Sequence, residues 1–197
     1  MNSKIAAVVT ALGALLTASA FAKEPQTIYR DSEFKFRLKY PDKWITLKPV
    51  GQNVRLSIKS PEGRPPATCN VVVRSMSESA SMSQAQIDAE INEKTLTTDE
   101  AKALIIGTLR NAQLIESKRS KINNIPGQFG VIERSNETLD SKIFSREMKF
   151  VTFTPGYVWH LMCGSPGTSP VYAKQAYKQW EPTFRGLFDS FTLEPWR

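Results

Sequence analysis

The sequence predicts an α+β protein in which strands lie before and after a helical middle segment. Three observations lead to this fold class. Apolar and charged residues alternate strictly over residues 33–40, as in a half-buried antiparallel strand. A helix-capping pattern with helical apolar spacing follows at residues 97–112. An aromatic stripe at helical spacing begins after Ser169, so a last helix should cover the sheet.

The first strand is expected at residues 33–40, with one apolar and one charged face. The apolar face carries Phe34, Phe36, Leu38 and Tyr40. Pro41-Asp42-Lys43 breaks this strand. Further extended segments are expected at residues 44–47, 54–59 and 69–76, and the loop at residues 61–66 is rich in proline.

Two helices are expected in the middle of the chain. The first covers residues 84–93 and is polar. The second begins at Thr97, which forms a capping box with Glu100. Its apolar stripe continues at helical spacing to Ala112 and consists of Ala101, Leu104, Ile105, Leu109 and Ala112.

The second half of the chain predicts long strands and a terminal helix. Strands are expected at residues 114–123, 128–134, 143–154 and 157–163. Turns are expected at residues 125–127, 136–140 and 155–156, and residues 164–167 should end the sheet. Pro170 stands at the first position of the last helix. Because proline removes an internal hydrogen bond, Pro182 predicts a kink or a restart near Glu181.

Residues 1–22 have the pattern of an export signal. Lys4 precedes a mostly apolar run, and Ala20-Phe21-Ala22 offers small residues at alternate positions for signal peptidase. We expect cleavage after Ala22, which leaves residues 23–197 as a single domain in the periplasm or outside the cell. The alternative is an uncleaved membrane anchor, because the segment is nearly long enough to cross a bilayer. No cysteine follows the run, so no lipid anchor is expected.

Two cysteines, Cys69 and Cys163, are the only ones in the chain. Each shares a strand face with apolar residues, so both thiols should point inward. In an oxidising compartment the simplest expectation is one disulfide between them. The alternative is a pair of free cysteines in the core.

Two segments resemble the PsbP-like superfamily. Residues 34–44 read Phe-Lys-Phe-Arg-Leu-Lys-Tyr-Pro-Asp-Lys-Trp, similar to its aromatic strand followed by Tyr-Pro-x-x-Trp, and residues 188–191 are similar to its closing Ser-Phe. This superfamily includes photosystem PsbP subunits, bacterial DcrB-like envelope proteins and nuclear Mog proteins. The resemblance implies a central antiparallel sheet of about six to seven strands flanked by helices, used for binding or assembly and not for catalysis. The short export signal favours the envelope proteins as the analogy.

The sequence contains no motif that identifies a reaction or a cofactor. His160 is the only histidine, so a metal site with several histidine ligands is excluded and a catalytic triad would have to use this residue. An ordinary position on a strand is the simpler interpretation of His160. Ser165 lacks the spacing of a nucleophile elbow. Asp99 and Glu100 fit the first turn of a helix, where negative charge is favourable. We therefore expect no enzyme, no metal and no cofactor.

Basic side chains on predicted outer strand faces are the most suggestive remaining feature. The candidate binding residues are Lys35, Arg37, Lys39, Arg55 and Lys59, and a third strand carries Lys118, Arg119 and Lys121. If these strands are neighbours, their charges add to a surface that attracts an anionic ligand or an acidic protein. The alternative is a solvated face or an edge protected by lysine.

These observations lead to a non-enzymatic, exported binding or assembly module of the cell envelope. Its partner is expected to be an envelope protein or an anionic ligand, with membrane contact at most peripheral. Nucleic acid is not expected, because no recognition helix or aromatic platform is evident. The alternatives are a secreted hydrolase of envelope polymers that uses dispersed carboxylates, and a subunit whose aromatic helix serves assembly.

Overall fold

The computed structural model describes residues 25–137 and 141–194. The expected export signal and part of the turn at residues 136–140 lie outside the described residues. The strands are β1 (Gln26–Asp31), β2 (Phe36–Pro41), β3 (Ile45–Thr46), β4 (Val54–Lys59), β5 (Thr68–Ser75), β6 (Ala112–Ile122), β7 (Ile125–Glu137), β8 (Lys142–Thr154), β9 (Tyr157–Gly167) and β10 (Thr192–Leu193). The helices are η1 (Ser77–Ser79), α1 (Gln84–Glu93), α2 (Thr98–Ile106) and α3 (Pro170–Ser190). None of these helices is long and apolar enough to cross a bilayer.

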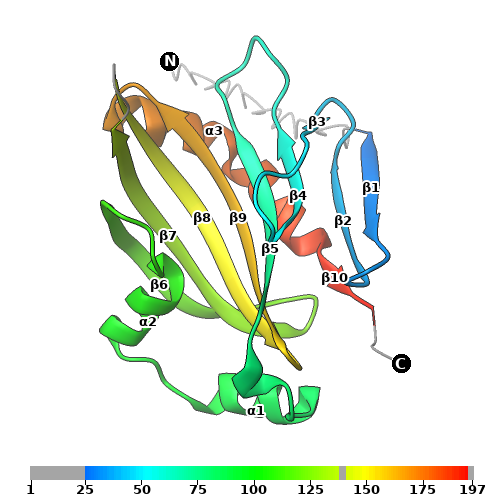
Figure 1. The fold of residues 1–197 in the computed structure, drawn as a ribbon. Helices are drawn as coiled ribbons and strands as arrows, with labels where there is room; N and C mark the ends of the chain where they lie inside the picture. The colour runs from blue at the N-terminus through cyan, green and yellow to red at the C-terminus, as the bar shows by residue number, and fades with distance from the viewer. Residues whose placement is uncertain (1–24, 138–140, 195–197) are drawn as a thin grey trace, which may run out of the picture.

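The strands form two sheets. A large antiparallel sheet has the order β3-β4-β5-β9-β8-β7-β6, and a small antiparallel sheet has the order β1-β2-β10. Figure 1 shows α3 behind the large sheet, with α1 and α2 on the viewer's side and the small sheet at the right. This arrangement is α+β, as expected. The strand β1 was not predicted, although its residues alternate between exposed and half-buried.

The main core lies between the large sheet, the small sheet and α3. The predicted apolar face of the first strand is buried: Phe34, Phe36, Leu38 and Tyr40 expose 7%, 1%, 3% and 6% of their surface. Trp159 on β9 is fully buried, and its ring meets Phe36 edge to face at 5.8 Å between centroids. Such contacts add to the free energy gained by burying apolar surface.

The helix α3 confirms the predicted aromatic stripe but not the predicted restart. Ser169 caps it by accepting a hydrogen bond from the backbone N–H of Tyr172, and Pro170 stands in its first turn. The helix continues through Pro182 to Ser190. Trp180 and Phe184, on either side of the proline, are both buried in the core. We attribute the continuity to this packing, which offsets the hydrogen bond that proline cannot make.

A smaller apolar cluster lies on the opposite face of the large sheet, under α2. Ile105 and Ile106 pack there on Ile132 of β7 and Val151 of β8. The predicted continuation of this helix to Ala112 is wrong. The helix ends at Gly107, whose φ of 57° is easily adopted by glycine, and Ala112 already begins β6.

The turns and one strand end differ from the prediction. The β6–β7 turn is formed by Asn123 and Asn124, with φ values of 47° and 67°, and the expected turn at residues 125–127 is the start of β7. Asparagine tolerates such φ values, as a tight hairpin requires. The strand β9 runs to Gly167 because it stays paired with β8, so the sheet does not end at Gly164.

The predicted disulfide between Cys69 and Cys163 is confirmed. The two residues are partners across β5 and β9, and the described part of the chain has no free cysteine. Both are buried in the main core, as the alternation predicted. The bond joins residues 94 positions apart and so ties the first half of the large sheet to the second.

Candidate functional site

The basic residues predicted to share one surface are divided between two sheets. Arg37 and Lys39 are exposed on β2 in the small sheet, whereas Arg55 and Lys59 lie on β4 in the large sheet. The third basic group, Lys118, Arg119 and Lys121, lies on β6. This strand forms one edge of the large sheet, and β3 and β4 lie at the other edge. The strands are therefore not neighbours, and one continuous positive face across them is not formed.

Lys35 lies in a turn and not on the outer face of a strand. Its φ is 53°, and its carbonyl oxygen accepts a hydrogen bond from the backbone N–H of Glu194. The strand β2 begins only at Phe36. The alternation in the sequence therefore identified the buried residues correctly, but it began the strand too early.

Arg55 is engaged in contacts within the protein. Its guanidinium lies 4.0 Å from the ring centroid of Phe34, and its Nη1 atom is 3.2 Å from a carboxylate oxygen of Glu33. These contacts hold Arg55 over the edge of the core, in a cation–π arrangement. Lys59 is half-buried on β4, between Ile45 of β3 and Thr68 of β5. Neither side chain extends the exposed surface of β2.

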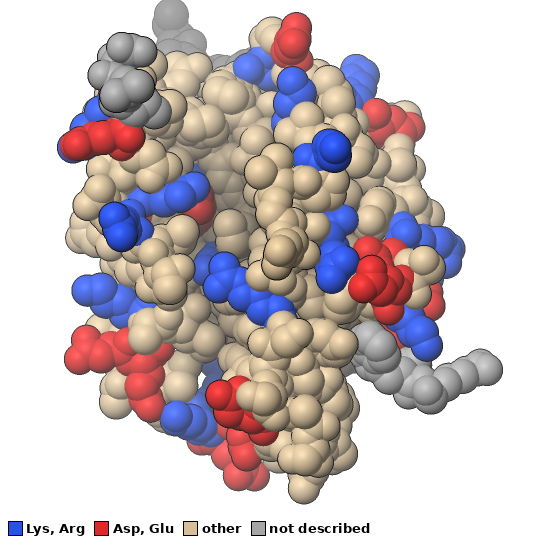
Figure 2. Space-filling model, viewed as in Figure 1, with Lys and Arg blue, Asp and Glu red and all other residues tan. Residues whose placement is uncertain are grey.

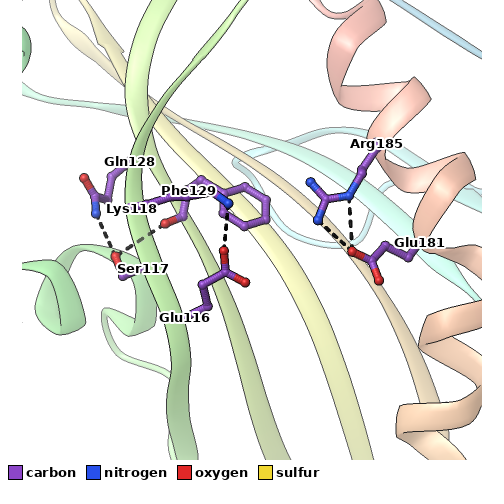
Figure 3. A network of polar contacts seen from close by, with 7 residues as sticks. All are labelled: Glu116, Ser117, Lys118, Gln128, Phe129, Glu181 and Arg185. Atoms are coloured by element: carbon purple, nitrogen blue, oxygen red, sulfur yellow. Dashed lines mark hydrogen bonds and ion pairs between the residues drawn. The ribbon is translucent and has the colours of Figure 1, made fainter.

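Two cations of β6 are also held by neighbours. Figure 3 shows the Lys118 amine bonded to Glu116, with the ring of Phe129 between Lys118 and Arg185. Arg185 is in turn bonded to Glu181 one turn earlier in α3. Arg119 donates hydrogen bonds to the carbonyl oxygens of Asn92 and Lys94 at the end of α1. The contacts of Arg119 and Arg185 thus link α1 and α3 to the sheet.

The outer side of the small sheet keeps an exposed basic surface, which we name the small-sheet face. It consists of Arg30 on β1 and Arg37 and Lys39 on β2, with the exposed Ile28 between them. Arg30 pairs directly with Arg37, and Ile28 with Lys39. Like charges opposite each other weaken a sheet, and here they concentrate positive charge at one place.

Few groups on the small sheet offset this charge. Arg30 lies 3.9 Å from a carboxylate oxygen of Glu194, with both side chains at least half exposed. Arg37 donates a hydrogen bond of 2.7 Å to the neutral hydroxyl of Thr192 on β10. Sequence reasoning missed Arg30 because β1 was not predicted, although the alternation of Gln26–Asp31 was a usable signal.

The residues considered for catalysis have structural partners or buried positions. Glu100 caps α2, and the backbone N–H of Thr97 helps to hold its pKa at about 2. Ser165 is fully buried. His160 lies on β9 on the face opposite Trp159 and Leu161, as predicted, and burial lowers its pKa to about 3. Within residues 25–137 and 141–194, no group of three acidic, histidine or cysteine side chains is placed to bind a metal.

A large apolar cleft lies where α1 and α2 meet the lower end of the large sheet. Its volume is about 650 Å³, within the range of small-molecule sites. Met82, Ile87, Leu104 and Phe153 are among its lining residues. No pattern in the sequence indicated this cleft, because its walls come from η1, α1, α2, β6, β7 and β8, which only the fold brings together.

Solved structures with the same arrangement cover most of the chain. The PsbP protein of the cyanobacterium Synechocystis (CyanoP) matches with a TM-score of 0.50 and 12% identity, covering 92% of this chain and 100% of that chain. LpqN, involved in cell envelope biogenesis of Mycobacterium tuberculosis, matches at 0.50 and 11%, covering 87% and 91%. A mutant of the protein Mog1 matches at 0.50 and 8%, covering 86% and 96%.

The chain has the PsbP-like fold. The resemblance seen in residues 34–44 and 188–191 is thereby confirmed at the level of structure. Both segments contribute to the core of the PsbP-like fold, where the ring of Phe36 lies 5.8 Å from that of Phe191. No family model matches the sequence, and no curated protein sequence matches it.

Proposed function

We propose that this protein is an exported, non-enzymatic binding module of the cell envelope, which engages an acidic envelope protein through the small-sheet face. The observation that carries the proposal is the direct pairing of Arg30 with Arg37 beside the exposed Lys39. Two arginines directly opposite each other destabilise the pair of strands that carries them. Binding of an anionic partner would offset this repulsion, and it is the role that we propose for Arg30 and Arg37. LpqN, which shares the fold, is involved in cell envelope biogenesis.

The disulfide supports a place of action outside the cytoplasm. Disulfides form and persist in oxidising compartments such as the periplasm, and thiols in the cytosol are kept reduced. The bond between Cys69 and Cys163 lies in the core, where it contributes to the fold. Together with the export signal expected at residues 1–22, it supports a periplasmic or secreted protein.

The test is a charge reversal on the small-sheet face. We compare the wild-type protein with the triple variant Arg30→Glu, Arg37→Glu, Lys39→Glu in crosslinking to native envelope. Proteins crosslinked to the wild type are identified by mass spectrometry, purified, and titrated with each variant at several salt concentrations. The proposal predicts an acidic partner whose affinity falls as salt rises, because screening weakens exposed charge pairs.

A matched control places the same charge change elsewhere. The variant Lys102→Glu, Lys174→Glu, Lys178→Glu alters exposed lysines on α2 and α3. It should bind the partner like the wild type, while the small-sheet variant should lose most of the binding. Equal loss in both variants, or unchanged affinity of the small-sheet variant, would refute the role of this face.

A further inference from the structure

The open face of the large sheet, on the side opposite α3, contains a polar hollow. Its volume is about 120 Å³, and it lies over β5, β9, β8 and β7. Figure 2 views this face and shows a depression in its upper middle, with Lys and Arg atoms at its left and lower sides. The residues whose polar side chains line the hollow include Thr68, Asn70, Arg134, Asn136, Ser145 and Glu147.

The floor of the hollow is an ion pair between the half-buried Arg134 and the buried Glu147. Nε of Arg134 donates a hydrogen bond of 2.6 Å to Oε1 of Glu147, and the hydroxyl of Ser145 donates to the same oxygen at 2.9 Å. Glu147 exposes 7% of its surface. Its neighbour across the strands is Gly164, which has no side chain to cover it. The pair therefore lies at the base of an open space.

Positive charge exceeds negative charge on this face. Among the described residues of β5, β7, β8 and β9, the charged side chains on the open face are Arg74, Arg134, Lys149 and Glu147. Lys149 is 5% exposed, and its amine donates to the carbonyl oxygen of Ile105 at the end of α2. The negative end of the helix dipole thus stabilises the charge of Lys149, as does the nearby carboxylate of Glu147.

Arg134 is the group best placed to bind an anion. A guanidinium carries five N–H groups in a planar fork, and Nε–H is the one bonded to Glu147. The side chain is 27% exposed, so the terminal N–H groups reach the hollow. Asn70 lies on the opposite wall, on β5, and its amide has no hydrogen-bond partner among the described residues. The guanidinium of Arg134 can donate two parallel hydrogen bonds to an anion with two oxygen atoms, and the amide of Asn70 can donate a further one from the opposite wall.

We propose that this hollow binds a phosphate group through the guanidinium of Arg134 and the amide of Asn70. The phosphate is either free or the ester of a glycerol phosphate head group. The site is separate from the small-sheet face, so its failure would leave the proposed function untouched. The hydrogen bond to the buried Glu147 holds the guanidinium of Arg134 in place, so little side-chain entropy is lost when the anion binds.

The only histidine gives the test a direct reporter. His160 lies two residues along β9 from Met162, which is the cross-strand partner of Asn70. Its ring proton signal can be followed by NMR in the intact protein during titration with inorganic phosphate and, separately, with glycerol phosphate. The proposal predicts a saturable shift with a dissociation constant on the order of 1 mM. Tighter binding of glycerol phosphate identifies the ester as the source, and equal or tighter binding of inorganic phosphate identifies the free anion.

Two variants and a control make the test decisive. Asn70→Asp puts a negative charge on the wall without touching the ion pair, and Arg134→Lys keeps the charge but loses the fork. Each should weaken binding at least about tenfold. Gln175→Glu on the exposed side of α3 should bind like the wild type. A wild-type signal that does not saturate below about 50 mM phosphate, or an unchanged affinity in Asn70→Asp, would overturn the proposal.

Discussion

Gly164 and Glu147 lie directly opposite each other on β9 and β8, and the glycine makes room for the glutamate. A Cβ atom on Gly164 would lie 2.5 Å from Cγ of Glu147 and 3.1 Å from the carbonyl oxygen of Arg146. The missing side chain lets Glu147 reach Nε of Arg134 at 2.6 Å. The ion pair under the hollow therefore depends on a glycine 17 positions away in the sequence.

Gly164→Ala should destabilise the protein by about 1–3 kcal/mol, because the methyl group overpacks the site and displaces Glu147. Urea unfolding followed by circular dichroism measures the change. Gly186→Ala is the matched control, because a Cβ on Gly186 in α3 meets nothing within 4 Å. It should stabilise the helix by about 0.5–1 kcal/mol. This account would be contradicted if Gly164→Ala left the unfolding free energy unchanged while the control Gly186→Ala lowered it.

Reduction of the disulfide should cost about 4 kcal/mol of stability. The bond closes a loop of 94 residues, and its loss restores that conformational freedom to the unfolded chain. Urea unfolding with and without reductant measures the difference. The double variant Cys69→Ala, Cys163→Ala should unfold at the same urea concentration in both conditions, close to that of the reduced wild type. Equal midpoints for oxidised and reduced wild type would exclude a stabilising role.

The unfolding free energy should depend on pH through His160. Burial, with the positive charges of Lys149 on β8 and Arg74 on β5, lowers its pKa from 6.5 to about 3. Between these two values the unfolded chain binds a proton that the folded chain does not. Stability should therefore fall as pH falls from 6.5 to 3, by at most about 1.4 kcal/mol per pH unit.

The variant His160→Gln isolates this contribution. Its side chain cannot take up a proton, so the difference in stability between wild type and variant should shrink or reverse as pH falls through this range. Other acidic groups titrate in both proteins and cancel in the comparison. An NMR titration gives an independent measurement, because the His160 ring signal should not move between pH 7 and pH 5. A midpoint near 6.5 would contradict the assigned burial.

Local alternation predicted which residues are buried, but not which strands are partners. The faces of Phe34, Phe36 and Leu38 follow from period-two spacing, which holds whatever the neighbouring strand is. The strand β2 pairs with β1 through contacts that are local in the sequence, and with β10 through contacts between residues more than 150 positions apart, such as Arg37 with Thr192. The predicted basic surface depended on β2 and β4 being neighbouring strands, and it does not extend over both because the two strands belong to different sheets.

The errors at turns have a different cause. Pro126 and Gly127 are typical turn residues, yet they lie inside β7, just after its first residue Ile125, because Asn123 and Asn124 already reverse the chain. Gly127 is needed for packing, since a Cβ there would lie 2.4 Å from the carbonyl oxygen of Val151 and 2.5 Å from the ring of Phe150. A glycine selected for close approach and a glycine selected for a turn give the same sequence signal.

Asn123 joins the β6–β7 turn to the end of α3, and its replacement should loosen that junction. Its side-chain amide donates hydrogen bonds to the carbonyl oxygens of Asp189 and Phe191, at 2.6 and 2.8 Å. Carbonyls at the end of a helix have no partner within the helix. Asn123→Asp keeps the shape of the side chain, but a carboxylate can only accept hydrogen bonds, so it cannot donate to these two carbonyl oxygens. It also places negative charge at the negative end of the helix dipole. We expect a loss of about 1–2 kcal/mol.

The neighbouring Asn124 separates this effect from the backbone conformation of the turn. Its φ is 67°, close to the 47° of Asn123, and no hydrogen bond of its side chain is found among the described residues. Because aspartate also tolerates this region, Asn124→Asp changes charge and little else, and its effect should stay within about 0.5 kcal/mol. Urea unfolding compares the two variants, and hydrogen exchange should show faster opening of the last turn of α3 in Asn123→Asp alone. Equal destabilisation of both variants would assign the loss to the turn itself and remove Asn123 as the link between the hairpin and the helix.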